Sequence, residues 1–524
     1  MIAKVYSIVP FGFSGALVEV EGDKNHGLPA FNIVGMANKT INEARDRVRS
    51  ALVNSSFSFP CDKITINLAP ADLQKDGTYL DLPIALSVLL LSEQLLPKDV
   101  EGRIFVGELS LEGSLRPIHG IINIIESAKK LGFKEVFLPM ENLPQASLIS
   151  GIKLVGVSSL LELFSILKHQ TLPSSPVKTV VKRTGTPTSS ISLNGIKGQE
   201  LAKRALSIAV AGHHNILISG PPGAGKTLLA RAAVNLLPPL TPAEQIPLTK
   251  LYSLLSSDCG VIDSRPFRCP HHSASSVSIL GGGSTVTPGE ISLAHLGVLF
   301  LDELPEYPRS VLESLRQPLE DRQVTITRAK ARVTYPADFM LIATMNPCPC
   351  GFYGDPTKAC TCSPSEIKNY QKKLSGPLLD RIDILINVQK VPTAALSLHG
   401  EASSTDEQEV VKNKISGAIN RQHARYHTPY VSNSSLSSAE TAKFIHLAPS
   451  AESLLRSAAE HLELSARSFF KTIKVAQTIA DYENQDVIQP EHISEALSYR
   501  LDQTKDSFII SGKPKKTLAM SPKI

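Results

Sequence analysis

The sequence lacks a long apolar run, a secretory signal, short-period repeats and a strong excess of charge of one sign. Its longest apolar run, Leu82 to Leu91, is about half of what a membrane span requires. The amino terminus has one early lysine and becomes polar by Glu19, unlike a signal peptide. We therefore predict a cytoplasmic protein. A net charge of +5 does not indicate nucleic-acid binding, which would need local basic patches.

The length of the chain, 524 residues, exceeds what one hydrophobic core organises and predicts about three domains. Between Gln170 and Ser192 the sequence is rich in Pro, Ser, Thr and Lys, which indicates a linker. A second boundary falls near residues 398–405, and helical patterns follow it. The predicted parts are residues 1–169, the linker 170–192, residues 193–397, a helical domain 398–505 and a basic tail 506–524.

A glycine-rich loop lies between a short apolar strand, residues 215–219, and a predicted helix, Leu228 to Leu236. This order is what a phosphate-binding loop requires, because its backbone N–H groups close around phosphates. Its lysine would supply positive charge to the β- and γ-phosphates, and its threonine hydroxyl would be a Mg²⁺ ligand. We predict a site for ATP and Mg²⁺ formed by Gly220, Pro221, Pro222, Gly223, Ala224, Gly225, Lys226 and Thr227.

Two carboxylates follow a second apolar strand, residues 298–301. Four consecutive apolar residues are typical of a strand buried on both faces, and ligands bind where such strands end. Asp302 would hold Mg²⁺ through water, and Glu303 would polarise the attacking water. The alternative is a solvated acidic strand end, but this one follows a complete phosphate loop.

Four of the seven cysteines gather in a short loop that is also rich in glycine and proline. Their thiolates would converge on one tetrahedral Zn²⁺. The spacing departs from the commoner two-residue gap, so a reduced loop without metal stays an alternative. The predicted zinc ligands are Cys348, Cys350, Cys360 and Cys362.

Residues 193–500 resemble the AAA+ ATPase module of the magnesium-chelatase-like clade. The segment Leu341 to Pro347 is similar to its sensor-1 strand, which implies that Asn346 helps to orient the attacking water. The resemblance implies an α/β fold in which a P-loop parallel sheet carries an α-helical lid. It also implies a ring of subunits, which we expect to be a hexamer.

Two arginines extend this resemblance. The segment Ser375 to Asp383 is similar to the one that carries the arginine finger, which implies that Arg381 reaches the γ-phosphate held by a neighbouring subunit. The segment Leu464 to Phe469 is similar to the start of the sensor-2 helix, which implies that Arg467 is a further phosphate contact. Either arginine alone would more often form a surface ion pair.

Residues 1–169 resemble the proteolytic domain of Lon, which implies a ribosomal-S5-type α/β domain; the segments 107–120, 128–132 and 138–142 carry the resemblance. The catalytic positions do not carry over. Segment 76–79 is Asp-Gly-Thr-Tyr where Lon-like sequences place the serine, and 120–122 is Gly-Ile-Ile where they place the lysine. Thr78 remains as a candidate with no visible base. Without the serine–lysine dyad, we expect a scaffold or binding surface.

A Lon-like domain without its dyad, joined to a chelatase-type module with a Cys-Pro-Cys loop, resembles the YifB/ComM family. That resemblance implies an ATP-driven hexameric branch-migration helicase acting on DNA in homologous recombination and natural transformation. One alternative is a magnesium chelatase ATPase subunit, against which the Lon-like domain and the cysteine loop argue. Another is a protein-remodelling AAA+ ATPase whose first domain binds polypeptide.

Two segments are candidates for contacting single-stranded or branched DNA. Residues 321–334 alternate like a β-hairpin, and we expect Arg328, Lys330 and Arg332 to share one face. Chelatase-type proteins carry such a hairpin pointing into the ring channel. The other candidate is the insertion from Arg265 to Gly283. Basic side chains in a channel bind phosphates without regard to sequence, although a solvated strand face is the alternative for the hairpin.

Overall fold

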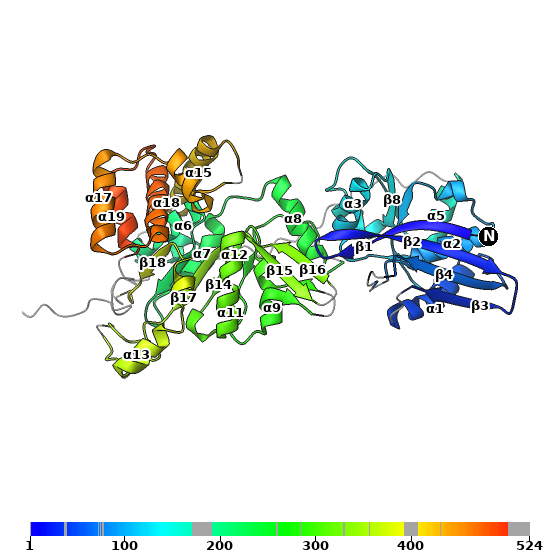
Figure 1. The fold of residues 1–524 in the computed structure, drawn as a ribbon, viewed down its shortest axis with the longest axis horizontal. Helices are drawn as coiled ribbons and strands as arrows, with labels where there is room; N and C mark the ends of the chain where they lie inside the picture. Colours follow the sequence, from blue (N-terminus) through cyan, green and yellow to red (C-terminus); the bar gives the residue numbers. More distant parts are fainter. Residues whose placement is uncertain are drawn as a thin grey trace, which may run out of the picture.

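The computed structural model describes residues 2–35, 39–71, 73, 75, 78–169, 191–257, 260–283, 286–328, 331–355, 357–391, 407–429 and 431–500. Three parts succeed one another along the long axis of the molecule: an N-terminal α/β part, a central part built on a parallel sheet, and a group of C-terminal helices (Figure 1). Most of the predicted linker and all of the predicted basic tail lie outside the described residues.

The N-terminal part is built on a seven-stranded sheet in the order β3-β4-β2-β1-β5-β8-β9. Its strands are β1 Ile2–Phe11, β2 Ser14–Asn25, β3 Ala30–Val34, β4 Lys63–Ala69, β5 Arg103–Phe105, β8 Glu135–Pro139 and β9 Lys153–Val157, with a separate pair β6 Glu108–Leu109 and β7 Leu115–Arg116. Its helices are α1 Lys39–Asn54, α2 Asp81–Leu91, α3 Ile121–Lys130, α4 Leu143–Ala146 and α5 Leu160–Leu167. Every residue of α2 is buried, so the longest apolar run of the sequence is a core helix.

The central part contains a five-stranded sheet in the order β11-β14-β17-β10-β18, in which every neighbouring pair is parallel. These strands are β10 Ile216–Ser219, β11 Phe267–Arg268, β14 Val298–Leu301, β17 Met340–Met345 and β18 Ile384–Asn387. Alternate side chains enter two cores: Ile216 and Ile218 pack in one, and Leu217 packs in the other. Such alternation is what a sheet covered on both faces requires.

Helices and two small strand pairs complete the central part. The helices are α6 Glu200–Gly212, α7 Lys226–Leu236, α8 Pro242–Ser253, α9 Ser276–Leu280, α10 Glu290–Leu293, α11 Arg309–Ser314, α12 Arg316–Asp321, α13 Pro364–Gln371 and α14 Gly376–Leu379. Outside the main sheet, β12 Gly281–Gly282 pairs with β13 Thr287–Pro288, and β15 Gln323–Arg328 pairs with β16 Ala331–Pro336.

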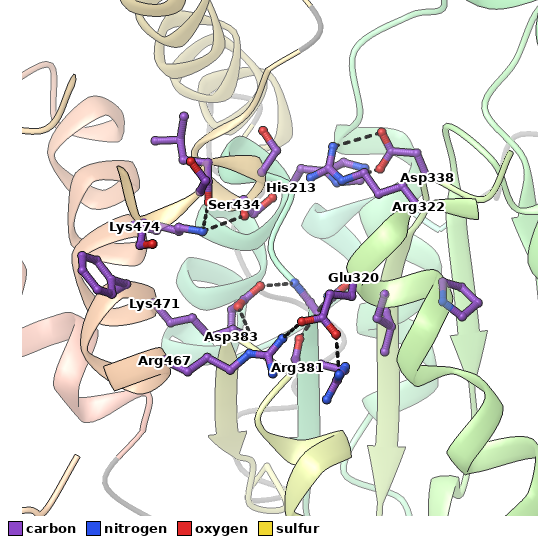
Figure 2. Close-up of a pocket in the computed structure, with 18 of the residues that line it drawn as sticks. His213, Glu320, Arg322, Asp338, Arg381, Asp383, Ser434, Arg467, Lys471 and Lys474 are labelled. Carbon is purple, nitrogen blue, oxygen red and sulfur yellow. Dashed lines mark hydrogen bonds and ion pairs between the residues drawn. The ribbon is translucent and has the colours of Figure 1, made fainter. Parts of the chain in front are cut away.

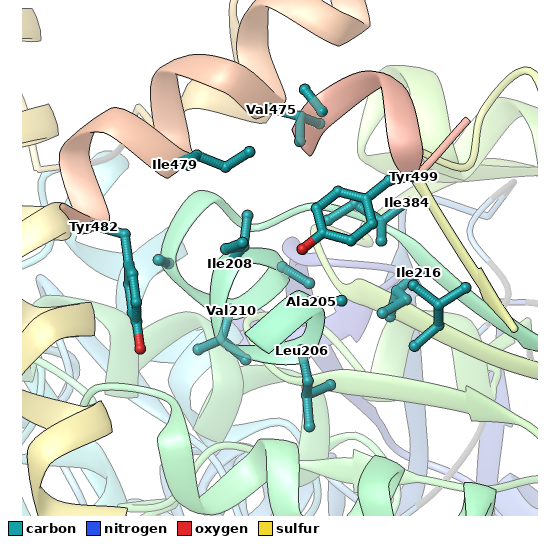
Figure 3. Close-up of a cluster of buried hydrophobic side chains, with 14 of the residues drawn as sticks. Ala205, Leu206, Ile208, Val210, Ile216, Ile384, Val475, Ile479, Tyr482 and Tyr499 are labelled. Atoms are coloured by element: carbon teal, nitrogen blue, oxygen red, sulfur yellow. The ribbon is translucent and has the colours of Figure 1, made fainter. Parts of the chain in front are cut away.

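The C-terminal helices form a lid on helix α6. They are α15 Glu407–Tyr426, α16 Ser438–Phe444, α17 Pro449–His461, α18 Ala466–Tyr482 and α19 Pro490–Ser498. Ile479 of α18 and Ile208 of α6 belong to one buried cluster that joins the lid to the sheet (Figure 3). The predicted α/β fold, a P-loop parallel sheet with a helical lid behind an N-terminal α/β domain, is confirmed. Among the described helices, none has the length and apolar character needed to cross a bilayer.

Candidate functional site

Three adjacent strands of the central sheet end at one edge and carry the predicted nucleotide-site residues. Strand β10 ends at Ser219 and leads through the glycine-rich loop into α7. Strand β14 ends immediately before Asp302, and β17, which lies between β14 and β10, ends immediately before Asn346. Ligands of α/β sheets bind at this carboxyl edge. The structure therefore brings together residues that the sequence predicts for one site.

Lys226 is buried at the first position of α7, with 8% of its surface exposed. Its ammonium donates hydrogen bonds to the Asn346 side-chain oxygen at 2.8 Å, to the Pro221 carbonyl at 3.3 Å and to the Gly220 carbonyl. Burial lowers its pKa to about 8, and the nearby Asp302 carboxylate opposes that change. A bound anion would favour the charged form and raise this pKa again.

Asp302 lies between two hydroxyl groups. The Thr227 hydroxyl donates to one carboxylate oxygen at 3.3 Å, and the Thr344 hydroxyl donates to the other. Carboxylate and hydroxyl oxygens are ligands that Mg²⁺ accepts. Thr344 also accepts a hydrogen bond from the Glu303 backbone N–H at 3.0 Å, so it holds both acidic residues in place.

Glu303 has a left-handed backbone, with φ at +52°. A non-glycine residue in this region stores strain, which persists where the surroundings fix the conformation, as the bond to Thr344 does here. Sequence reasoning missed Thr344. Its signal was a hydroxyl on a strand whose six residues are all buried and otherwise apolar.

Arg381 and Arg467 lie at the opposite edge of the sheet, in a cavity of about 690 Å³ between sheet and lid (Figure 2). Both guanidinium groups form ion pairs with Glu320 of α12. The Arg381 carbonyl accepts a hydrogen bond at 3.2 Å from Asn215, the residue before β10. The glycine-rich loop follows the other end of β10. The two arginines are thus near each other and away from Lys226 of their own chain.

A buried ion pair joins the lid to the same edge of the sheet. Asp383, before β18, lies 2.7 Å from the Lys471 ammonium of α18, and their side chains are 9% and 14% exposed. The Asn215 backbone N–H donates to the other Asp383 oxygen at 3.0 Å. This pair fixes the lid helix that also carries Arg467.

The four predicted zinc ligands converge, since their sulfur atoms all lie within 4.8 Å of one another. Cys348 Sγ is 3.4 Å from Cys350 Sγ and 3.6 Å from Cys360 Sγ. Backbone N–H groups of Cys350 and Tyr353 donate to Cys362 and Cys348 at 3.4 Å and 3.3 Å, which suits thiolate sulfur. The loop also touches the nucleotide site, because a Cβ on Gly351 would lie 2.7 Å from Pro222.

The β15–β16 hairpin has a register that differs from the predicted arrangement of its basic residues. Thr327 pairs with Arg332, and Arg328 pairs with Ala331. Directly paired residues share a face, so positions 328 and 332 fall on opposite faces and the expectation of one basic face is wrong. Arg332 is exposed. Lys330 lies outside the described residues.

The arginines of the other candidate DNA segment have carboxylate partners within the chain. Arg265 contacts both oxygens of Glu244, at 3.1 Å and 3.2 Å. Arg268 contacts both oxygens of Glu290, at 2.6 Å and 2.7 Å. Pairs of this kind hold the insertion against α8 and α10 and leave the hairpin as the better candidate for phosphate contact.

The positions that correspond to the Lon dyad are occupied by packing residues. Ile122 is fully buried, and Tyr79 packs against two N-terminal cores. Thr78, for which the sequence shows no base, donates a hydrogen bond to the Glu108 carboxylate. Glu108 also lies 3.5 Å from Arg116. Asp76 and Gly77 lie outside the described residues.

Relatives of this chain align with it over nearly all of its length. It is 42% identical over 505 residues to a Haemophilus influenzae protein named competence protein ComM, covering 95% of this chain and 97% of that protein. It is 41% identical over 504 residues to an uncharacterized Salmonella typhimurium protein named YifB, with the same coverage. The chain belongs to the YifB/ComM family. The resemblance predicted from the sequence is confirmed.

Parts of the chain also match families described as magnesium chelatase subunit ChlI, over residues 192–396 and 20–142, and its C-terminal part, over residues 405–500. A Chlorobaculum parvum protein named magnesium-chelatase 67 kDa subunit is 30% identical over 159 residues, which cover 30% of this chain and 23% of that protein. Members of the YifB/ComM family are thus magnesium-chelatase-like AAA+ proteins, and this membership indicates an ATPase that uses ATP and Mg²⁺.

Proposed function

We propose that this protein is an ATP-driven DNA motor that works as a hexameric ring and migrates branched DNA during homologous recombination and natural transformation. The observation that carries the proposal is the placement of two kinds of residue at opposite edges of one sheet. The nucleotide-site residues lie at the carboxyl edge, and Arg381 and Arg467 lie at the amino edge. A site divided in this way is complete only between subunits.

In the hydrolysis step, the N–H groups of the glycine-rich loop and the Lys226 ammonium would hold the phosphates. Thr227 and Asp302 would hold Mg²⁺, which supplies charge neutralisation at the phosphates when bound. Glu303 would accept the proton of the attacking water, and Asn346 would orient that water. Lys226 and Asn346 are already joined by a 2.8 Å hydrogen bond.

In a head-to-tail ring, the amino edge of one subunit faces the carboxyl edge of the next. Arg381 would then act as the arginine finger on a neighbour's γ-phosphate, and Arg467 beside it would contact the same nucleotide. Glu320 holds both side chains together before they engage phosphate. Since the finger comes from another chain, an isolated subunit should hydrolyse ATP slowly.

The proposed DNA contact is the exposed face of the β15–β16 hairpin. This face carries Arg332 with Thr327 and the hydrogen-bonded pair Thr325 and Thr334. Arg328 and Lys330 stay in the proposal as further phosphate contacts, although position 328 falls on the other face of the hairpin. Such contacts ignore base sequence, so binding should weaken steeply with salt. The name of the Haemophilus relative, competence protein, agrees with a role in natural transformation.

The cysteine loop would hold one Zn²⁺ as a structural clip. A tetrahedral site with Zn–S distances of about 2.3 Å needs sulfur atoms about 3.8 Å apart. The sulfur separations of 3.4–3.6 Å approach this value. Elemental analysis of protein purified without chelator should give one zinc per chain, and Cys360→Ser should lower it. Substitution of the exposed Cys61 by Ser is the control. A zinc content near zero in the wild type contradicts the site.

Two variants test the nucleotide roles. Lys226→Ala should abolish nucleotide binding, whereas Glu303→Gln should bind ATP and stop turnover. Wild-type hydrolysis by Glu303→Gln would show that another group activates the water.

A triple change of Arg328, Lys330 and Arg332 to Ala should weaken DNA binding and leave ring formation and basal hydrolysis unchanged.

The chelatase alternative has one observation in its favour, the match of all three parts of the chain to ChlI families. The named chelatase subunit nevertheless covers only 30% of this chain. A chelatase subunit should respond to protoporphyrin rather than to DNA, so the same ATPase assay separates the two functions.

A further inference from the structure

The turn between β1 and β2 lies against the β15–β16 hairpin, although the two segments are far apart in sequence. The Phe13 ring meets the Tyr335 ring edge-on, with centroids 6.4 Å apart. Gly12 has φ at +58°, and a Cβ there would lie 2.4 Å from a Val333 methyl carbon. Only glycine allows both this backbone conformation and this approach. Figure 1 shows β1 reaching toward β16 at the junction of the two parts.

Helix α8 closes the same junction from a second side. Lys250 is 6% exposed, and its ammonium lies 4.1 Å from the centroid of the Phe13 ring. The same ammonium forms an ion pair with Glu126 of α3. A further link is the hydrogen bond of 2.8 Å from the Gly120 backbone N–H to the Ser253 carbonyl. The aromatic ring therefore packs between a buried cation and the hairpin.

The hairpin needs this cover. A two-stranded hairpin is marginally stable alone in water, and one face of this hairpin is apolar and buried. Val324 and Val333 are 5% exposed and Tyr335 is 1% exposed. Val333 and Tyr335 form a buried cluster with Leu251 of α8. Phe13 of the turn packs on this cluster, as do the partly buried side chains of Tyr252, Leu254, Val286 and Ile326. The first strand pair of the chain thus supplies part of the hairpin's core.

We infer that the β1–β2 turn is a positioning element: it holds the buried face of the hairpin so that the opposite face, with Arg332, is presented to DNA. The inference rests on the proposed function for the DNA step alone. Phe13 is a positioning residue, because its contacts are with Tyr335 and Lys250 and it acts on DNA only through the hairpin. It gives the N-terminal part a task that needs no proteolytic dyad.

The test is Phe13→Ala in the full chain, with two readouts. Amide hydrogen exchange of peptides covering residues 323–336 should become about tenfold faster, because the hairpin opens locally more often. In ATPase assays, the DNA concentration for half-maximal stimulation should rise by about tenfold, with basal hydrolysis unchanged. Phe13→Tyr, which keeps the ring, should restore both values. Phe11→Ala is the matched control, since Phe11 is the last residue of β1, next to the turn, and is 37% exposed.

The outcomes are distinct. Unchanged hairpin exchange in Phe13→Ala overturns the inference, whatever the DNA result. Faster exchange with unchanged DNA stimulation also overturns it, because the turn would then stabilise without positioning. If the ATPase activity of the wild type does not respond to DNA, the proposed function fails. Faster amide exchange confined to the hairpin in Phe13→Ala would still support the contact of the turn with the hairpin. Equal effects of Phe11→Ala and Phe13→Ala would show a general loss of stability and contradict the inference.

Discussion

Mixing two inactive variants tests whether Arg381 acts between subunits. Arg381→Ala removes the predicted finger, and Glu303→Gln removes the predicted water-activating carboxylate. Strand β10 separates the two edges of the sheet and has four residues, or about 13 Å at ~3.3 Å per residue. Arg381 is held at the far end by the Arg316 carbonyl at 3.1 Å and the Pro377 carbonyl at 2.7 Å. It should not reach the nucleotide of its own chain.

The size of the expected recovery follows from the ring geometry. Loss of an arginine finger lowers kcat by about 10³- to 10⁵-fold, so each pure variant should be nearly inactive. In rings mixed at random in equal amounts, about a quarter of the head-to-tail interfaces pair an intact finger with an intact glutamate. The mixture should therefore recover up to about a quarter of the wild-type rate.

The assay is steady-state ATP hydrolysis at fixed total protein, with the two variants mixed before ring formation. Labelled subunits and energy transfer should show that mixed rings form. Mixing Arg381→Ala with Lys226→Ala should recover activity equally, because Lys226 also acts at the carboxyl edge. Mixed rings with no more activity than the pure variants would refute action in trans.

Three further predictions follow from the buried groups. Burial lowers the pKa of Lys226 to about 8, and bound phosphate favours its charged form. The affinity for labelled ATP should therefore fall by up to about tenfold per pH unit above pH 8. Lys226→Arg should remove this pH dependence. Asp383→Asn leaves the Lys471 charge buried without its partner, so chemical denaturation should show a loss of about 3–5 kcal/mol, and a loss under 1 kcal/mol would contradict the burial of the pair. Thr344→Val removes the hydroxyl that holds Asp302, and kcat should fall by roughly 10- to 100-fold with nucleotide affinity retained; an unchanged kcat would show that Thr344 positions nothing.

The convergence of the predicted nucleotide-site residues could be predicted because they lie in short segments with fixed spacing. A strand followed by a glycine-rich loop leaves little freedom for Lys226 and Thr227. Apolar strands before Asp302 and Asn346 placed those residues at the same edge. The cysteine cluster was predictable for the same reason, since a single loop carries all four thiols.

Other features could not be predicted because they depend on strand register or on contacts between segments that are far apart in the sequence. The face of Arg332 follows from the pairing register of β15 with β16, and a shift of that register by one residue moves every side chain to the other face. The carboxylate partners of Arg265 and Arg268 lie on the helices α8 and α10, so the local sequence does not show that these arginines form ion pairs. The contact of Gly12 with Val333 joins distant segments, and no local pattern predicts it.

The central claim, that ATP hydrolysis drives work on DNA, is tested most directly by one ATPase measurement at low salt. Turnover is compared without addition and with single-stranded DNA, forked DNA, unfolded polypeptide and protoporphyrin, using Glu303→Gln as the blank. We expect both DNA forms to raise turnover, the triple hairpin variant to lose that response, and the other two additions to have no effect. Stimulation by polypeptide or by protoporphyrin with no response to DNA would contradict the account.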